Sequence, residues 1–392
     1  MKKFHLLFIK IGNLINFIIN SLIIKLIHLQ KRPIKEKTLL IIRLDSIGDY
    51  ILVQNLFNDL RNDYFFKNYN ITLCGNIIWK DLAEHCNKND FDKFIWINKK
   101  KLKWNLFYKY DTLQKIYLAG YETAVETTFS REILYGDTII KASKSKERIG
   151  YGGSQENYVK WKRSLFSDDY YTKLITQSSE ILFEFYRNKE FFEKMLKKKI
   201  EITKPYLDFN SIKMYLPLPQ EYIVIVPGAQ EKSRRWSEKK FIELIKSLLN
   251  NFTFDVVLVG SASEYKITEK IAEQINSERV LNLAGKTNLP ELGKIISNAK
   301  LLISNETSAV HFAAAVDTKF ICLSNGQRFG RFMPYPKEMN LINEYFYPYY
   351  IEKNLTKFNK LAEELKEASK FDINEISIDK VLNAVKKLLE SK

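Results

Sequence analysis

The chain has 392 residues, too many for one typical hydrophobic core, and suits two domains of ordinary size. Hydrophobic residues make up 45% and aromatic residues 14% of the chain, which excludes disorder as a global description. Three widely separated cysteines are typical of a reducing compartment rather than a disulfide framework, and the four histidines have no metal-ligand spacing, so we expect no structural zinc.

Positive charge is concentrated in the first half. The net charge is +16, and residues 1–210 hold 36 Lys and Arg against 24 Asp and Glu. Lysine-rich clusters at 99–101, 141–148, 160–163 and 197–199 fit an anionic partner: nucleic acid, acidic lipid headgroups or a phosphorylated glycan. A lysine-biased, solvated surface explains the same pattern, so both interpretations stay open.

Residues 4–30 predict an amphipathic helix. Lysines and asparagines interrupt each apolar run well short of the about 18 residues that a transmembrane helix needs, and no small-residue cleavage site follows. One helical face collects Phe4, Phe8, Ile11, Ile15, Ile18, Leu22, Leu26 and Leu29. With the basic stretch 31–37, this pattern is expected of an interfacial helix on an anionic membrane surface. The alternative is a helix packed on the protein's own core or on a second subunit.

Strand-like and helix-like segments then alternate in two series. Strands are expected at 38–44, 71–75, 94–97 and 122–129, and a proline-containing linker at 205–219. A second series follows, with strands in "YIVIVPG", "FDVVLVG", "VLNLAG", "LLIS" and "FICLS", and a C-terminal helical segment ends the chain at 351–392. Such alternation predicts parallel sheets covered by helices, in two α/β domains with a cleft between them.

The first strand ends in a polar turn, Asp45-Ser46-Ile47-Gly48-Asp49. Ligands of open α/β sheets bind outside the carboxyl ends of the strands, so the turn is either an ordinary connection or the working edge of a site.

Turns of the second series indicate a phosphate ligand. "VPGAQ" and "VGSASE" leave their strands through Gly228 and Gly260, which allow close backbone approach. In "SNETSAVHFAAA", Thr307 and Ser308 begin a helix whose exposed N–H groups suit a diphosphate. Arg234 and Arg235 could supply counter-charge.

Other nucleotide chemistry finds less support. Neither a P-loop nor a "GxGxxG" follows either domain's first strand, which argues against an ATPase or a dehydrogenase. Asp90-Phe91-Asp92 matches the acidic pattern that holds a metal-bound nucleotide in some glycosyltransferases, but its position before "KFIWI" is typical of a surface loop.

The segments "RLDSIGDYIL", "PGAQEKSRRWSEKKF", "VGSASE" and "LAGKTNLPELGKIISNAKLLISNETSAVHFAAA" resemble, in order and spacing, the ADP-heptose:lipopolysaccharide heptosyltransferases of glycosyltransferase family 9. The resemblance runs from about residue 38 to about residue 326. It implies an α/β GT-B fold, in which two Rossmann-like domains face a central cleft. Residues 1–37 would then precede an acceptor-binding domain at 38–204, and the nucleotide sugar would bind to a domain at 220–350.

The resemblance also implies roles for single residues. Asp49 falls where the family has its general base, and Arg43, Ser46 and Gly48 fall beside it on the acceptor side. Arg234 replaces a phosphate-contacting lysine, and Glu264 matches a glutamate that holds the ribose. The remaining donor-side positions are Gly228, Arg235, Gly260, Thr287, Glu306, Thr307, Ser308, His311, Gln327 and Arg328.

Two segments depart from the family pattern. The usual "DTG" appears as Glu306-Thr307-Ser308, and "NGQRFGRFMPYP" replaces a "GP" turn, which places Gln327, Arg328 and Arg331 near the cleft. These changes leave the donor sugar open.

The implied protein is a bacterial, inverting, metal-independent glycosyltransferase without a cofactor. It would move heptose or a related sugar from a nucleotide donor, with ADP-heptose as a candidate, to a lipid-linked lipopolysaccharide or surface-glycan acceptor. It would be cytoplasmic and peripheral at the inner face of the plasma membrane, with no nucleic-acid partner. A GT-B nucleotide-sugar epimerase and a non-catalytic glycan-binding protein are the alternatives; the oligomeric state stays open.

Overall fold

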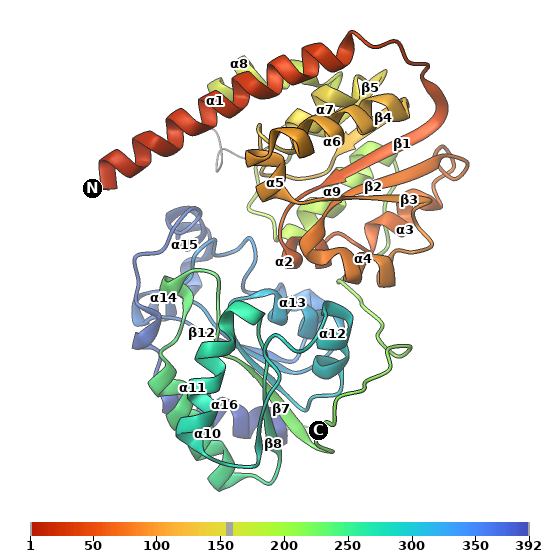
Figure 1. Cartoon of the computed structure of the whole chain (residues 1–392). Helices are drawn as coiled ribbons and strands as arrows, with labels where there is room; N and C mark the ends of the chain where they lie inside the picture. The colour runs from red at the N-terminus through yellow and green to blue at the C-terminus, as the bar shows by residue number, and fades with distance from the viewer. Residues whose placement is uncertain (1, 154–159, 391–392) are drawn as a thin grey trace. The chain divides into compact units, whose positions relative to one another are not determined.

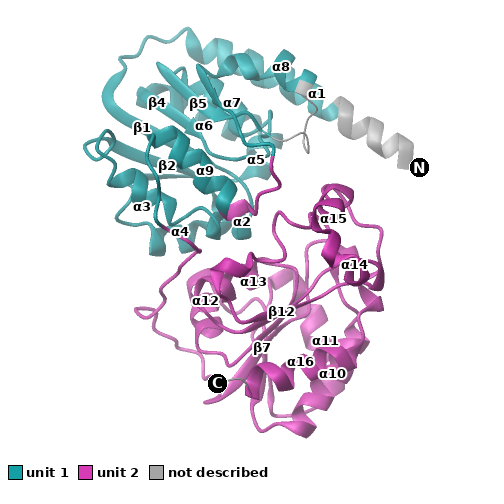
Figure 2. Ribbon diagram, turned by 180° about the vertical axis from the view of Figure 1, so that it is seen from behind, with its two compact units in different colours: residues 1–179, 186–201 teal, residues 180–185, 202–392 magenta. Residues whose placement is uncertain are grey.

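The protein is represented by a computed structural model that describes residues 2–153 and 160–390. It consists of two compact units (Figure 2). Unit 1 comprises Met1–Ser179 and Tyr186–Glu201, and unit 2 comprises Glu180–Phe185 and Ile202–Lys392. Residues 202–219 contain no helix or strand and belong to unit 2, where the Leu207 amide bonds to the Ala315 carbonyl at 2.8 Å.

Unit 1 is built on a parallel sheet of six strands in the order β3-β2-β1-β4-β5-β6 (Figure 1). Its strands are β1 Lys35–Arg43, β2 Asn70–Asn76, β3 Lys93–Ile97, β4 Tyr121–Glu126, β5 Glu147–Tyr151 and β6 Lys173–Ile175. Its helices are α1 Lys2–His28, α2 Ile47–Ile51, α3 Leu56–Arg61, α4 Lys80–Cys86, α5 Lys99–Trp104, α6 Leu106–Ala119, α7 Gly136–Ser143, α8 Lys160–Phe166 and α9 Glu184–Leu196. The first two residues of α9, Glu184 and Phe185, belong to unit 2. The four strands predicted for this half are present, and β4 ends at Glu126, three residues before the predicted end at 129.

Unit 2 repeats this architecture with the order β12-β11-β10-β7-β8-β9. Its strands are β7 Tyr222–Val226, β8 Asp255–Leu258, β9 Val280–Asn282, β10 Leu302–Asn305, β11 Phe320–Leu323 and β12 Asn343–Phe346. Its helices are α10 Glu238–Asn251, α11 Tyr265–Ile275, α12 Leu289–Ser297, α13 Ser308–Ala315, α14 Tyr349–Lys353, α15 Phe358–Glu364 and α16 Ile378–Glu390.

Both sheets have the strand order of doubly wound dinucleotide-binding folds. Counted within each unit, the order is 3-2-1-4-5-6, and it reverses between the first and fourth strands. Ligands of such sheets bind at the carboxyl ends of those two strands. The candidate ligand-binding positions are therefore the carboxyl ends of β1 and β4 in unit 1, and of β7 and β10 in unit 2.

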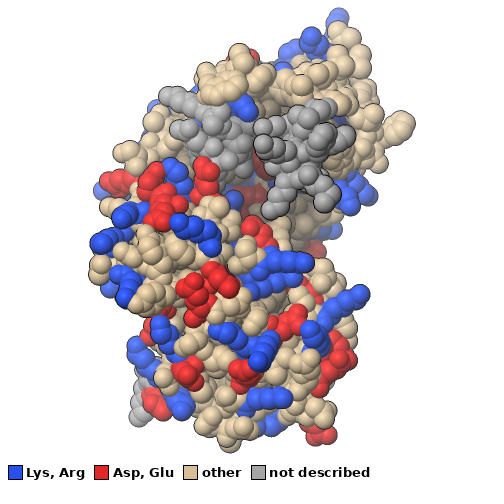
Figure 3. Space-filling view, turned by 90° about the vertical axis from the view of Figure 1, so that its left-hand side faces the viewer, with Lys and Arg blue, Asp and Glu red and all other residues tan. Residues whose placement is uncertain are grey.

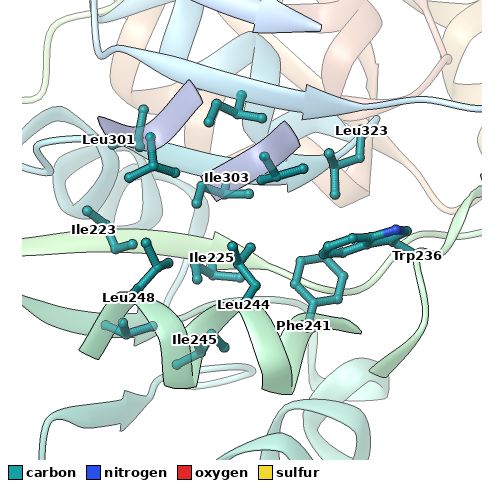
Figure 4. Packing of buried hydrophobic residues seen from close by; sticks show 14 of the residues in the cluster. Ile223, Ile225, Trp236, Phe241, Leu244, Ile245, Leu248, Leu301, Ile303 and Leu323 are labelled. Carbon is teal, nitrogen blue, oxygen red and sulfur yellow. The ribbon is translucent and has the colours of Figure 1, made fainter. Parts of the chain in front are cut away.

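The core of unit 2 shows why its sequence folds this way (Figure 4). Residues three, four and seven positions apart on α10 form one apolar stripe: Phe241, Leu244, Ile245 and Leu248. The stripe packs with Ile223 and Ile225 of β7, which is buried along its whole length. Helix α16 adds Val381, Val385 and Leu388 to the same core, so the C-terminal helix belongs to unit 2.

Helix α1 packs on α6 and α7 through a mixed face. Ile24 and Ile27 are buried there, and so are two asparagines. Lys109 Nζ donates to Asn16 Oδ1 at 2.9 Å, and Asn20 Nδ2 donates to Thr138 Oγ1 at 2.9 Å. The predicted apolar face is exposed at Ile15, Ile18, Leu22, Leu26 and Leu29.

The contacts with α6 and α7 agree with the alternative of a helix that packs on its own unit, whereas contact with a membrane stays a prediction. The helix packs on its own unit, and its apolar face stays exposed. The side chains of Phe4, Phe8 and Ile11 lie outside the described residues. Among the helices that the structure describes, none is long and apolar enough to cross a membrane.

Candidate active site

The buried side chain of Arg43 holds the turn after β1 in place. This last residue of β1 is fully buried, and its Nε lies 2.6 Å from Asp45 Oδ2. Its NH1 donates to the Thr127 carbonyl at 2.9 Å and to Asn188 Oδ1 on α9 at 3.0 Å. Arg43 therefore joins the turn to the end of β4 and to α9, and Asp45 neutralises its charge.

Asp49, the last residue of the predicted polar turn, lies in the first turn of α2, which already begins at Ile47. Ser46 precedes the helix, and its Oγ donates to Asp49 Oδ2. Ser46 is exposed, Asp49 is half-buried and Gly48 is buried. The next residue, Tyr50, is buried and stacks on Trp79 with ring centroids 4.4 Å apart, which fixes the helix. The arrangement presents one carboxylate, held by one hydroxyl, at the carboxyl end of β1.

The acidic pair Asp90 and Asp92 is bound by the protein itself. Asn87 Nδ2 donates to Asp90 Oδ2 at 2.7 Å, and Arg61 NH2 lies 2.7 Å from Asp92 Oδ2. Partial burial raises the pKa of Asp92, but hydrogen bonds from Arg61 and the Ile71 amide outweigh it, and the net shift of this pKa is downward. Within the part of the chain that the structure describes, no group of three or more His, Cys, Asp or Glu could hold a metal ion.

A buried charged cluster follows β4, and we did not predict it. Glu126 ends that strand; burial, and then repulsion by Asp137, raises its pKa to about 8. Tyr171 Oη donates to Asp137 Oδ1 at 2.6 Å, and Arg131 lies 4.6 Å over the Tyr171 ring. The one available signal was the position of Glu126 at a strand end that neighbours β1.

In unit 2, Gly228 and Glu264 are in close contact. A Cβ on Gly228 would lie 2.0 Å from Glu264 Oε1, so only glycine leaves room for this carboxylate. The backbone N–H and Oγ of Ser261 donate to Glu264 Oε2 at 2.8 and 2.7 Å. Gly260 leaves more room, because a Cβ added there would lie 3.3 Å from Glu264 Oε2. The ends of β7 and β8 thus hold the predicted ribose-binding carboxylate in one fixed position.

Asn305, at the end of β10, connects the neighbouring turns. Its Nδ2 donates to the carbonyls of Pro227 and Gly228 at 2.8 and 3.2 Å. Its Oδ1 accepts from the Trp236 amide at 3.1 Å. The glycine turn and the arginine segment are therefore fastened to the strand that leads into α13.

Arg234 and Glu306 form an ion pair at the same edge. Arg234 NH2 lies 3.1 Å from Glu306 Oε1 and also donates to the Glu306 carbonyl. Ser324 Oγ donates to Glu306 Oε2, and Glu306 is only 5% exposed. Arg235 Nε donates to the Ala229 carbonyl at 2.7 Å. The carboxylate of Glu306, the glutamate that replaces the family's aspartate, is thus bound by side chains of unit 2.

Helix α13 begins directly after this pair. Thr307 is its N-cap and accepts from the Ala309 amide at 3.3 Å, while Ser308 is the first helical residue. His311 lies one turn further on, 6% exposed, with Nδ1 2.7 Å from Tyr335 Oη. Thr307 and Ser308 therefore stand at the helix start, whereas His311 is inside the unit.

The other predicted donor-side residues follow β9 and β11. Thr287 is half-buried after Gly285, whose amide bonds to the Gly260 carbonyl at 2.9 Å. Gln327 is half-buried, and its amide donates to Asn325 Oδ1 at 3.1 Å. Arg328 is exposed.

Arg331, in contrast, is bound inside unit 2. Its Nε lies 2.7 Å from Oε2 of Glu184, and both side chains are buried or nearly so. In unit 2, the predicted donor-side residues other than His311 lie at the carboxyl ends of the strands or in the turns that follow them. In unit 1, Arg43, Ser46, Gly48 and Asp49 lie at the carboxyl end of β1. The roles of all these residues stay predictions.

Comparison with known proteins identifies the family. The model of glycosyltransferase family 9 (heptosyltransferase) matches residues 132–361, more than half of the chain. The chain belongs to glycosyltransferase family 9. The predicted family is thereby confirmed.

Curated relatives match over shorter stretches. Lipopolysaccharide heptosyltransferase 3 of Escherichia coli is 35% identical over 109 residues, which cover 28% of this chain and 32% of the relative. Lipopolysaccharide heptosyltransferase 2 of Salmonella typhimurium is 35% identical over 101 residues, which cover 25% and 29% of the two chains. The match thus spans about a third of the length of these curated relatives.

Solved structures show the fold. A family 9 glycosyltransferase from Veillonella parvula superposes with a TM-score of 0.68 at 15% identity, over 92% of this chain and 99% of that one. The E. coli ADP-heptose lipopolysaccharide heptosyltransferase II gives 0.64 at 16% identity, over 90% and 98%. The predicted α/β GT-B fold is confirmed.

Proposed function

We propose that this protein is an inverting glycosyltransferase that moves heptose or a related sugar from a nucleoside-diphosphate donor to a lipid-linked surface glycan. The observation that carries the proposal is the edge of unit 2 at which Arg234, Glu264 and the start of α13 come together. A helix start offers N–H donors to phosphate oxygens, and a guanidinium adds positive charge. A carboxylate fixed by Ser261 is suited to ribose hydroxyls.

The names of the similar proteins point to the same substrates. The curated relatives are lipopolysaccharide heptosyltransferases, and an E. coli heptosyltransferase of the same fold has been solved with ADP and with ADP-2-deoxy-2-fluoro heptose. ADP-heptose is therefore the first donor to test, and a lipopolysaccharide core the first acceptor. We propose no cofactor, no metal and no nucleic-acid partner.

The proposed chemistry assigns one role to each unit. In unit 1, the Asp49 carboxylate takes the proton of the acceptor hydroxyl while that oxygen attacks the anomeric carbon. The new bond forms on the side opposite the diphosphate, whose bond to the anomeric carbon breaks, so the configuration inverts. In unit 2, Arg234, Arg235 and the start of α13 stabilise the charge that develops on the leaving nucleoside diphosphate.

Glu306 bears on the choice of donor sugar. Its carboxylate is bound by Arg234 and Ser324. It therefore sets the position of Arg234 at the start of α13, and a donor must fit this pair. Heptose, or a sugar that tolerates the longer acid, remains the proposed group for transfer.

The proposed acceptor implies an enzyme that works at a membrane. A lipid-linked glycan is built at the inner face of the plasma membrane, and we propose a peripheral, cytoplasmic enzyme there. Family membership favours transfer over both alternatives, the nucleotide-sugar epimerase and the non-catalytic glycan-binding protein.

Two experiments test the proposal: thermal unfolding with a panel of nucleotide sugars, and then a transfer assay with and without acceptor. The nucleotide sugar that the protein binds should raise its melting temperature, because ligands of the native state stabilise it by mass action. With that donor, a transferase releases nucleoside diphosphate only when acceptor is present. Isomerisation of the donor sugar without acceptor would indicate the epimerase, and donor binding without either reaction would indicate a binding protein.

A further inference from the structure

Helix α1 is oriented with its apolar face outward. The inward face buries Asn16 and Asn20, which hydrogen-bond to α6 and α7. The outward face exposes Leu22 by 56%, Leu26 by 58% and Leu29, just after the helix, by 81%. Surface helices normally turn their apolar stripe toward the core. A continuous exposed stripe of this kind marks an interaction surface.

The stripe continues onto a neighbouring corner of unit 1, where α5 ends and α6 begins. Trp104, Leu106 and Phe107 are exposed there, Phe107 by 90%. Trp104 lies beside α1, because a Cβ on Gly12 would come within 3.8 Å of its Cη2. Lys103 Nζ lies 4.9 Å from the Trp104 ring. Tryptophan and lysine beside an apolar surface form the combination that settles at the boundary of a bilayer.

The charge around this surface selects its occupant. Residues 1–35 contain seven Lys and Arg and no Asp or Glu. Residues 93–110 contain six Lys and no acid, but Lys109 is buried and Lys99 pairs with Glu132, so four of these lysines are left to the surface. On the surface of unit 2 that Figure 3 shows, Lys and Arg lie among Asp and Glu. A surface with an excess of Lys and Arg attracts anionic lipid headgroups. A second copy of this chain would bring the same positive surface, so a symmetric contact would place like charges together.

We infer that this surface docks on an anionic lipid bilayer, with α1 lying in the plane of the interface. The docking surface consists of Leu14, Ile15, Ile18, Leu22, Leu26, Leu29, Trp104, Leu106 and Phe107. Helix α1 also carries Lys25, and helix α5 carries Lys100, Lys101 and Lys103. The biological purpose rests on the proposed function, because docking would hold unit 1 where a lipid-linked acceptor is displayed. Lipid binding itself requires no donor and no acceptor.

Co-sedimentation of the full chain with vesicles tests the inference. The probes are vesicles of phosphatidylcholine alone and vesicles that also contain phosphatidylglycerol. The double variant Leu22→Glu/Leu26→Glu alters two exposed positions of the docking surface. Its matched control is Tyr64→Glu/Tyr215→Glu, which removes two equally exposed aromatic side chains, 87% and 86% exposed, and adds the same charge elsewhere.

We expect the wild-type chain and the control to sediment with the phosphatidylglycerol vesicles and to be released as salt rises. The leucine variant should partition at least about tenfold less, because it loses two apolar anchors and gains two repelled charges. Its melting temperature and its transfer to a water-soluble acceptor fragment should match the wild type, which separates failed docking from a failed proposed function. Equal sedimentation of the leucine variant and the control would overturn the inference. So would a wild-type chain that ignores the vesicles and forms dimers that the leucine variant dissociates.

Discussion

The guanidinium of Arg234 and the carboxylate of Glu306 lie 3.1 Å apart, directly before the first turn of α13. Glu306 is buried, whereas the Arg234 side chain is 22% exposed. Glu306 is therefore the buried member of the pair, and Arg234 is the member that solvent reaches.

The two roles of Arg234 can be separated. Arg234→Ala should lower the free energy of unfolding by about 2 kcal/mol, because it leaves the Glu306 carboxylate without its cation, and should weaken ADP binding at least about tenfold. In Arg234→Ala/Glu306→Gln the stability should largely return, but ADP binding should not. Urea unfolding and calorimetric ADP titration measure the two effects. ADP affinity that recovers together with stability would limit Arg234 to a structural role.

Gly228 and Gly260 provide a matched test of the carboxylate of Glu264. Gly228→Ala places a Cβ 2.0 Å from Glu264 Oε1 and must displace this side chain, whereas Gly260→Ala leaves 3.3 Å to Oε2. We expect the first variant to weaken nucleotide binding about tenfold or more and the second to change it little. Equal nucleotide affinities in the two variants would argue against the proposed ribose contact.

Much of this site could be predicted from the alternation of strands and helices along the sequence and from the residues in the turns between them. The glycine turns at 228 and 260, the polar turn at 45–49 and the helix start at 307 are local features, and a parallel sheet brings such turns to one edge. The apolar face of α1 was likewise readable from its helical periodicity, but its outward orientation is known only from the structure. What the sequence could not supply was the partner of each side chain: that Glu306 binds Arg234, or that Asn16 faces Lys109, depends on packing between distant segments. The short strands β5, β6 and β12 were missed, because none of them has a long apolar run.

Glu126 should make stability depend on pH. Its pKa is raised from 4.5 to about 8 by burial, so between these pH values the folded state retains a proton that the unfolded state has lost. Stability should therefore fall as pH rises through this range, by up to about 1.4 kcal/mol per pH unit.

Glu126→Gln is the matched variant for this effect, because glutamine mimics the protonated acid. Its urea midpoint should vary less between pH 5 and pH 8 than that of the wild type, and it should be the more stable protein at pH 8. Parallel pH profiles of the two proteins would show that Glu126 ionises normally in the folded state.

Asp49→Asn should reduce turnover by about two to four orders of magnitude while donor affinity stays nearly unchanged, since a general base acts on the acceptor hydroxyl. Asp81→Asn, at an exposed position on α4, is the control and should keep wild-type turnover.

Asp45→Asn should act differently. It removes the counter-charge of buried Arg43 and should lower the stability of the protein more than it lowers the rate of the chemical step. Steady-state kinetics together with thermal unfolding distinguish these outcomes.

The most direct test of sugar transfer is ADP release from ADP-heptose, measured with and without a deacylated lipopolysaccharide core, for the wild type and for Asp49→Asn. We predict that the wild type releases ADP only when the acceptor is present, that the product carries the inverted anomeric configuration, and that Asp49→Asn loses at least about 99% of this activity. If ADP-heptose gives no reaction, the same comparison is made with the donor that the thermal panel selects. Equal ADP release by the wild type and Asp49→Asn, or a product with retained configuration, would contradict the proposed mechanism.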